Sequence, residues 1–232
     1  MTTPNLIFRY RFEISNGPII EKQFELGAQS LKLAKVANNP ALPAWTRLEF
    51  EKCSNCPLKP EEHSHCPIAA QLAQTVELFK DSLSTEKARI VVSAPERYYV
   101  KDTSLQEGIF SIFGFVMATA GCPHMSIVRP LARFHLPFAS LDDNVIRGVS
   151  MYLLRQYFKT LKGETPDVEL KKMEEFYGEI QKVNKGFAKR LRSVIDQGDA
   201  TINGLVALDS ISKMVSLQMQ SDFKKYAYLF EE

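Results

Sequence analysis

The N-terminal segment alternates between apolar and polar positions. Every second residue from Leu6 to Ile14 is apolar, the period of two that a half-buried strand requires. Asn16-Gly17 follows as a strong hairpin-turn signal, and Phe24 and Leu26 lie on one face of the returning segment. The pattern predicts a β-hairpin over residues 5–26.

Three further segments have strand character. TRLEFE at 46–51 predicts a short strand that leads into Cys53. ARIVV at 88–92 and RYYVK at 97–101 are separated by a turn containing Pro95, and they predict a second antiparallel pair that completes the sheet.

A helix is predicted directly after the third cysteine. Pro67 suits the first helical position, which makes Cys66 the N-cap. An apolar stripe follows at steps of three or four: Ile68, Leu72, Val76, Phe79 and Leu83. Because unpaired N–H groups and the helix dipole favour an anion at this position, we expect Cys66 to deprotonate readily.

From residue 103 onward the periodicity is helical. A capping box of Thr103 with Gln106, or of Ser104 with Glu107, predicts the start of a helix that is apolar on nearly every side and ends at Gly121. Three more helices are predicted, beginning at Ser140, at Thr165-Pro166-Asp167 and near Thr201. The second of these runs to about Gln197-Gly198, and the last runs to Gln220 with a possible amphipathic extension to Leu229.

Strands followed by helices indicate an α+β fold: a small N-terminal antiparallel sheet joined through a Cys/His loop to a C-terminal helical bundle. We expect a β-rich part over 1–102 and a helical part over 103–232, in one compact unit. No Asp, Glu, Lys or Arg occurs from Gly108 to Val128, but the helix-breaking residues 119–124 make this segment a buried core helix and not a membrane span.

Charge and composition exclude several classes of function. The 232 residues carry a formal charge of +2 and are 45% hydrophobic, which is ordinary globular composition. The basic run 182–192 is interpreted as the solvated face of a helix, so no nucleic acid partner is expected. Arginines near the N-terminus argue against an export signal and favour a cytoplasmic location, where cysteines are thiols or ligands.

The candidate chemistry lies in one stretch of the chain. All four cysteines and all four histidines fall between residues 53 and 135. Cys53 and Cys56 form a C-x2-C knuckle, Cys66 follows, and Cys122 comes just past the predicted helix end. The preferred hypothesis is a zinc site made by Cys53, Cys56, Cys66 and Cys122 that ties the sheet side to the bundle.

Alternatives stay open for both the ligands and the metal. His63, or His65 in its place, could replace Cys122, and Cys122 could also be simply a buried apolar residue. Three cysteines precede proline, as some iron–sulfur ligands do, although the intervals of two, nine and fifty-five residues match neither ferredoxin pattern. An iron–sulfur cluster is therefore the rival cofactor.

A second group of residues could bind a ligand. Arg129 and Arg133 could clamp an anion, or could pair with Asp142 and Asp143 at the next helix start. For a metal-dependent hydrolase, one coordination position would stay open and a histidine such as His63, His65, His124 or His135, or the carboxylate of Glu61 or Glu62, would carry the proton. Each of these has a simpler reading as a solvated or a core residue.

The segments WTRLEF, CSNCPL, HSHCPIA, TSLQEG, ATAGCP and RPLARFHLPFAS together resemble an uncharacterised bacterial family, a domain of unknown function, over most of the chain. This resemblance implies no activity and no ligand. The preferred function is a non-enzymatic, zinc-stabilised cytoplasmic protein that binds a protein partner or a small molecule; the alternatives are an iron–sulfur redox or sensor protein and a metal-dependent hydrolase.

Overall fold

A computed structural model describes residues 4–34, 42–221 and 223–231. Its sheet contains β1 (Leu6–Ile14), β2 (Ile19–Leu26), β3 (Lys87–Ala94) and β4 (Arg97–Ser104) in the order β2-β1-β3-β4, with every pair antiparallel. Asn16 has a φ of 61° in the first hairpin turn, the left-handed conformation that the Asn-Gly signal predicts. The hairpin and the second strand pair are confirmed.

The predicted strand at 46–51 is wrong. Residues 44–46 form a single 3-10 turn, η1 (Ala44–Thr46), and Arg47 makes only an isolated bridge with His65. The carbonyl groups of Trp45, Arg47 and Leu48 accept hydrogen bonds from a buried arginine, so they are not available to a sheet.

Helix α1 (Pro67–Phe79) begins as predicted, with Cys66 at the N-cap and Pro67 in the first turn. The helix ends before Leu83, however. Leu83 is 53% exposed, so its inclusion in the apolar stripe was wrong.

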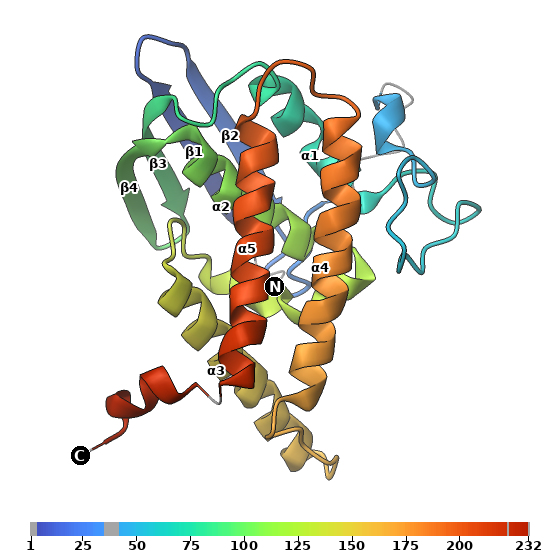
Figure 1. Cartoon of the computed structure of the whole chain (residues 1–232), viewed down its shortest axis with the longest axis vertical. Coiled ribbons are helices and arrows are strands. Elements are labelled where there is room, and N and C mark those ends of the chain that lie inside the picture. The colour runs from blue at the N-terminus through green and yellow to red at the C-terminus, as the bar shows by residue number, and fades with distance from the viewer. Residues whose placement is uncertain (1–3, 35–41, 222, 232) are drawn as a thin grey trace.

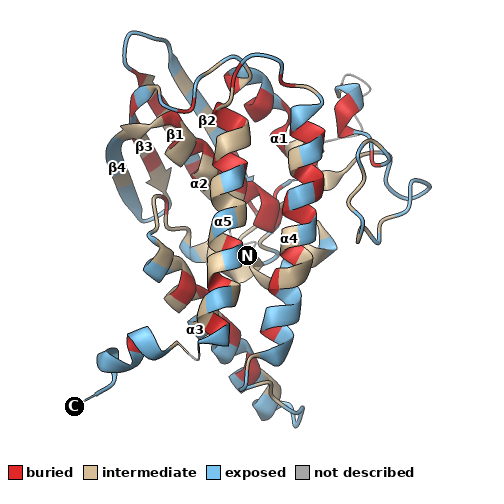
Figure 2. Cartoon of the chain, viewed as in Figure 1, coloured by how far each residue is buried: buried red, intermediate tan, exposed pale blue. Residues whose placement is uncertain are grey.

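Helix α2 (Leu105–Thr119) is the central buried element, as its composition predicts. Ser104 is the N-cap, but no side-chain hydrogen bond forms there and the predicted capping box is absent. The carboxylate of Glu107 instead accepts from Lys101 at 2.6 Å. Figure 1 shows α2 lying between the sheet and the α4–α5 pair, and Figure 2 shows that α2 is largely buried.

The bundle is completed by α3 (Leu141–Leu161), α4 (Lys171–Arg192) and α5 (Ala200–Gln220). The start of α3 is confirmed: Ser140 and Asp143 form a reciprocal capping box. The extension after α5 is a separate 3-10 turn, η4 (Lys224–Leu229).

The bounds of α4 differ from the prediction at both ends. The Asp167 carboxylate accepts from the Lys172 N–H at 2.9 Å and from the Tyr152 hydroxyl at 2.7 Å, so the Thr-Pro-Asp turn precedes the helix and does not begin it. After Arg192 the chain leaves the helix and crosses to the end of α1, where Asp199 accepts from the Ser84 N–H at 2.6 Å.

One buried core includes residues of the sheet, of α1 and α2, and of the inner faces of α4 and α5. A smaller buried group lies where α3, α4 and α5 meet near the far end of the bundle. Among the helices of the described residues, none has both the length and the apolarity needed to cross a lipid bilayer.

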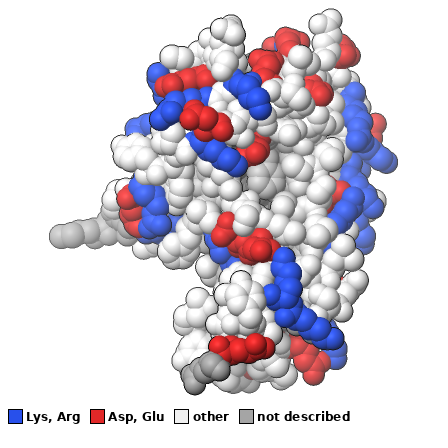
Figure 3. Space-filling view, turned by 60° about the vertical axis from the view of Figure 1, so that its left-hand side comes forward, with Lys and Arg blue, Asp and Glu red and all other residues white. Residues whose placement is uncertain are grey.

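The surface carries charges of both signs, with a line of Lys and Arg along one edge (Figure 3). On α4, Lys182, Lys185, Lys189 and Arg192 are exposed, as expected for a solvated face. The exception in this run is Arg190, which is 2% exposed, so its assignment to the solvated face was wrong.

Candidate functional site

Four thiols from three separate segments line one small cavity. The cavity has a volume of about 20 Å³, and its walls include Cys53, Cys56, Cys66 and Cys122. All four cysteines are free and half-buried. The other lining residues come mainly from α1, from the 3-10 turn η2 (Pro123–Ile127) and from α4: Leu58, Pro67, Ile68, His124, Val183, Phe187 and Arg190.

The C-x2-C knuckle lies directly against α4. The Cys56 N–H donates to the Cys53 carbonyl at 3.0 Å, which closes the turn. The Cys53 Sγ lies 3.8 Å from the Val183 carbonyl oxygen. A Cβ at Gly186 would stand 2.6 Å from that Sγ and 3.0 Å from the Cys53 Cα, so only glycine lets the knuckle approach the helix this closely.

Polar contacts hold the same knuckle from a second side. The Asn55 Nδ2 donates to the Glu179 carbonyl at 3.1 Å and to the Glu179 Oε2 at 2.8 Å. The His124 Nε2 lies 2.6 Å from the Asn55 carbonyl oxygen, and the His124 Nδ1 lies 3.8 Å from the Glu179 carboxylate. The His124 side chain therefore positions the loop that carries Cys53 and Cys56 by contacting the loop's backbone at Asn55.

Cys66 and Cys122 occupy matching positions. Each precedes a proline, each is the N-cap of a helical turn, and each has an extended backbone with φ −64° and ψ of 122° or 128°. The first N–H groups of each turn face the sulfur and favour its thiolate.

Burial nevertheless dominates the pKa of these thiols. Burial, with a smaller contribution from the neighbouring thiols, raises the pKa of Cys53 to about 11 and that of Cys122 to about 12. The pKa of Cys66 is also raised, because burial outweighs the N–H groups of Ile68 and Ala69. The expectation that Cys66 deprotonates readily was wrong, although the charge of Arg190 also favours its thiolate.

Arg190 supplies the only guanidinium in the cavity wall. Its Nη1 donates to the Trp45 carbonyl and, at 2.8 Å, to the Arg47 carbonyl, and its Nη2 lies 3.4 Å from the Leu48 carbonyl. Its Cζ lies 5.7 Å from the centre of the Phe50 ring. Within the described ranges no carboxylate lies within 4 Å of this buried cation, and burial lowers its pKa.

Of the predicted histidines, only His124 lines the cavity. His63 is exposed, and His65 contacts the Ser64 hydroxyl at 2.9 Å. His135 lies elsewhere, with its Nε2 against the Tyr10 hydroxyl and its ring 5.0 Å from that of Phe115. In the part of the chain that the structure describes, no three Cys, His, Asp or Glu side chains already stand in an arrangement that could hold a metal ion.

The two predicted anion-binding arginines do not share a cavity. The Arg133 Nη2 donates to Glu96 at 3.2 Å beside a hollow of about 240 Å³, whereas the buried Arg129 Nε has no partner among the described residues. Neither arginine pairs with the acidic residues at the start of α3. Asp142 bonds to Lys225 at 2.6 Å, and Asp143 caps its own helix.

A family model described as "Domain of unknown function (DUF6901)" matches residues 7–231. This match confirms the resemblance to a family without an assigned activity. No curated protein and no solved structure matches the chain.

Replacing Arg190 tests its anchoring role. In Arg190→Met the packing of the stem is kept, but buried carbonyl groups lose their donor, so we expect the free energy of unfolding to fall by about 3 kcal/mol or more. Urea denaturation followed by circular dichroism measures this loss. Arg192→Met, which changes an exposed residue two positions along the same helix, should change it by less than about 0.5 kcal/mol; equal effects would contradict the role.

His135 predicts a dependence of stability on pH. Burial and the nearby Arg147 lower its pKa from 6.5 to about 3 in the folded chain. Between pH 6.5 and about pH 3 the imidazole is protonated in the unfolded chain but not in the folded chain. The free energy of unfolding therefore falls with decreasing pH, by up to about 1.4 kcal/mol per pH unit.

Denaturation series between pH 7 and pH 4 check this prediction. His135→Gln keeps an acceptor for the Tyr10 hydroxyl but removes the titrating group, so its stability should fall less steeply with acid. The exposed His63→Gln should retain the wild-type slope. Identical slopes in all three proteins would show that His135 does not control the acid response.

Proposed function

Because the chain belongs to the DUF6901 family of domains of unknown function, we propose a function from the cysteine cavity itself. The protein is a zinc-binding, non-enzymatic protein of a reducing compartment such as the cytoplasm. Cys53, Cys56, Cys66 and Cys122 are the ligands, and the ion fixes the junction between the sheet side and the helical bundle. In this proposal the metal only stabilises the fold, and the protein as a whole acts as a binding or regulatory module.

The observation that carries the proposal is that four thiols, distant in sequence, line one cavity of about 20 Å³. This space suits a single ion better than a substrate. Four-sulfur sites are characteristic of structural zinc, whereas a catalytic zinc keeps one position open for water. The thiols would have to close in on the ion to coordinate it, because no three of them already stand in a metal-binding arrangement among the described residues.

The buried charge of Arg190 supports the same proposal. A buried cation requires compensation, and carbonyl oxygens supply only partial negative charge. Zinc with four thiolates carries a net charge of −2, which would give Arg190 a counter-ion. Coordination also replaces the proton on each sulfur, so burial no longer opposes ionisation.

An iron–sulfur centre is the second candidate, and it is favoured by the surroundings of two of the cysteines. Cys66 and Cys122 each combine a following proline with N–H groups that face the sulfur, and hydrogen bonds to sulfur tune such clusters. The smallness of the cavity favours zinc over a centre with several metal and sulfide atoms.

Metal analysis of protein purified without oxygen tests the proposal. We expect about one zinc per chain, the stoichiometry of a four-ligand site, with loss of the metal in Cys53→Ser and in Cys122→Ser and retention in the exposed His63→Gln. A brown protein whose visible absorption is bleached by dithionite would indicate that the cysteines hold an iron–sulfur centre and not zinc. Native protein without either metal would overturn metal binding, and serine variants that keep the metal would overturn the assignment of these cysteines as its ligands.

A second pair of variants changes no thiol. In Gly186→Ala the new methyl group would collide with Cys53 and displace the knuckle, so we expect weaker zinc retention against a chelator. Gly178→Ala lies two turns earlier on α4, where nothing stands within 4 Å of the new Cβ, and it should retain zinc like the wild type. Equal retention by the two variants would contradict the assignment of Cys53 as a ligand.

A further inference from the structure

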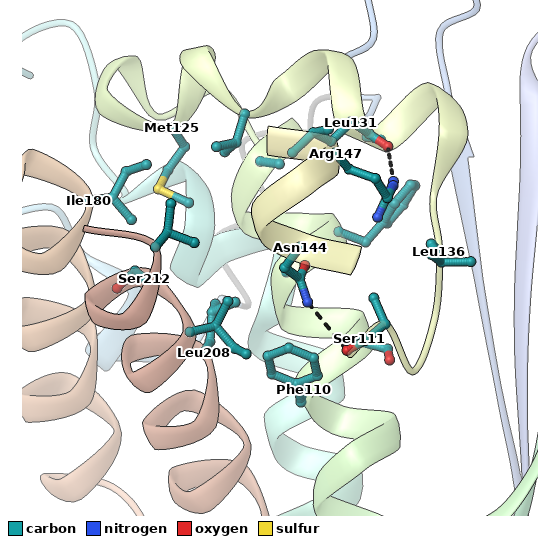
Figure 4. Close-up of a pocket in the computed structure, with 18 of the residues that line it drawn as sticks. Phe110, Ser111, Met125, Leu131, Leu136, Asn144, Arg147, Ile180, Leu208 and Ser212 are labelled. Atoms are coloured by element: carbon teal, nitrogen blue, oxygen red, sulfur yellow. Dashed lines mark hydrogen bonds between the residues drawn. The ribbon is translucent and has the colours of Figure 1, made fainter. Parts of the chain in front are cut away.

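A second cavity, separate from the cysteine cavity, lies inside the helical half of the molecule. Its volume is about 130 Å³, and α2, α3, α4, α5, η2 and the 3-10 turn η3 (Arg129–Phe134) contribute to its walls. Figure 4 shows Met125 and Ile180 on one side, Leu131 and Arg147 on the other, and Phe110 and Leu208 closing it. The walls are mainly apolar.

One buried polar group in this wall lacks a partner. Asn184 is 1% exposed; its Nδ2 lies 3.3 Å from the Ser212 Oγ, and its Oδ1 has no hydrogen-bond partner in the described chain. If the amide is turned over, the oxygen faces Ser212 and the nitrogen is the unpaired atom. Either way one end of a buried amide is unsatisfied, which costs about 1–3 kcal/mol without a ligand.

Two other polar side chains of the wall, Arg147 and Asn144, are already engaged. The Arg147 Nη2 lies 2.6 Å from the Phe134 carbonyl and 3.4 Å from the Leu131 carbonyl. The Asn144 Nδ2 donates to the carbonyls of Ala139 and Ser140, and Figure 4 marks one hydrogen bond from Arg147, beside Leu131, and one from Asn144 as dashed lines. Asn184, which is buried with one end of its amide unpaired, is the group that we expect to select a ligand.

We propose that this cavity binds a small, mainly apolar molecule that carries one hydroxyl group, as a simple phenol does. The apolar walls take the body of the molecule, and a cavity of this size can hold a single ring. A hydroxyl group both donates and accepts, so it satisfies the free end of Asn184 in either orientation of the amide.

The helix α4 keeps this site distinct from the cysteine cavity. Ile180 and Asn184, four residues apart, face the apolar cavity, whereas Val183 and Phe187 face the thiols. The inference therefore does not require the proposed metal, and the metal content of each variant can be measured independently of ligand binding.

Calorimetric titration of the purified chain with phenol, toluene and benzoate tests the proposal. We expect phenol to bind roughly tenfold more tightly than toluene, the ratio for one additional buried hydrogen bond. In Asn184→Leu, which removes the amide but keeps an apolar wall, toluene binding should persist while the preference for phenol disappears.

A variant that fills the apolar cavity tests whether phenol and toluene bind there or at another place on the protein. A Cβ at Gly114 would meet only the Leu208 Cδ1, at 3.7 Å, so Gly114→Leu should extend into the cavity and abolish binding of both ligands while the helix remains intact. Absence of phenol binding to the wild type, binding that survives in Gly114→Leu, an unchanged preference in Asn184→Leu, or tighter binding of benzoate than of phenol would each overturn the proposal.

Discussion

The contact between Arg190 and the backbone of residues 45–48 joins two segments that lie far apart in the sequence. A guanidinium from the last turn of α4 is buried among carbonyl groups that precede the knuckle, and no strand competes for those groups. This arrangement fixes the orientation of the loop that carries Cys53 and Cys56. It also brings a positive charge to the wall of the cavity into which all four thiols project.

α4 and η2 each present different faces to two cavities. On η2, His124 faces the thiols while Met125 lines the apolar cavity. Two neighbouring residues of η2 therefore belong to the walls of different cavities. In our proposals a metal ion in the cysteine cavity stabilises the junction, and the apolar cavity binds a ligand. The two cavities share structural elements, but no side chain lines both.

The sequence predicted those elements that depend on local periodicity. The first hairpin, the second strand pair, the start of α1 after Cys66 and the capping box at Ser140 were all recognised from signals within a few residues. The convergence of the segments that carry Cys53, Cys66 and Cys122 could be proposed from residue types, because cysteines rarely gather without reason, but the spacing alone left His63 and His65 open as alternatives to the preferred Cys122.

What the sequence did not reveal depends on contacts between distant segments. Arg190 was assigned to the solvated face because four of its basic neighbours are solvated; yet it follows Val183 and Phe187 at steps of four and three, so a helical wheel places it on the buried side. Residues 46–51 alternate like a strand, but the carbonyl groups of Arg47 and Leu48 bind a side chain more than a hundred positions away. Asn184 gave no signal, because a single polar residue in an amphipathic helix is unremarkable until its surroundings are known.

The order of the chain has a consequence during synthesis. Cys53, Cys56 and Cys66 leave the ribosome well before Cys122, and Arg190 comes later still. At translation rates of roughly 5–20 residues per second, on the order of ten seconds pass between Cys66 and Arg190. Until Cys122 emerges the nascent chain presents three thiols without the fourth, and until Arg190 emerges none of them has the cation beside it, so oxidants have their best access before the polypeptide is finished.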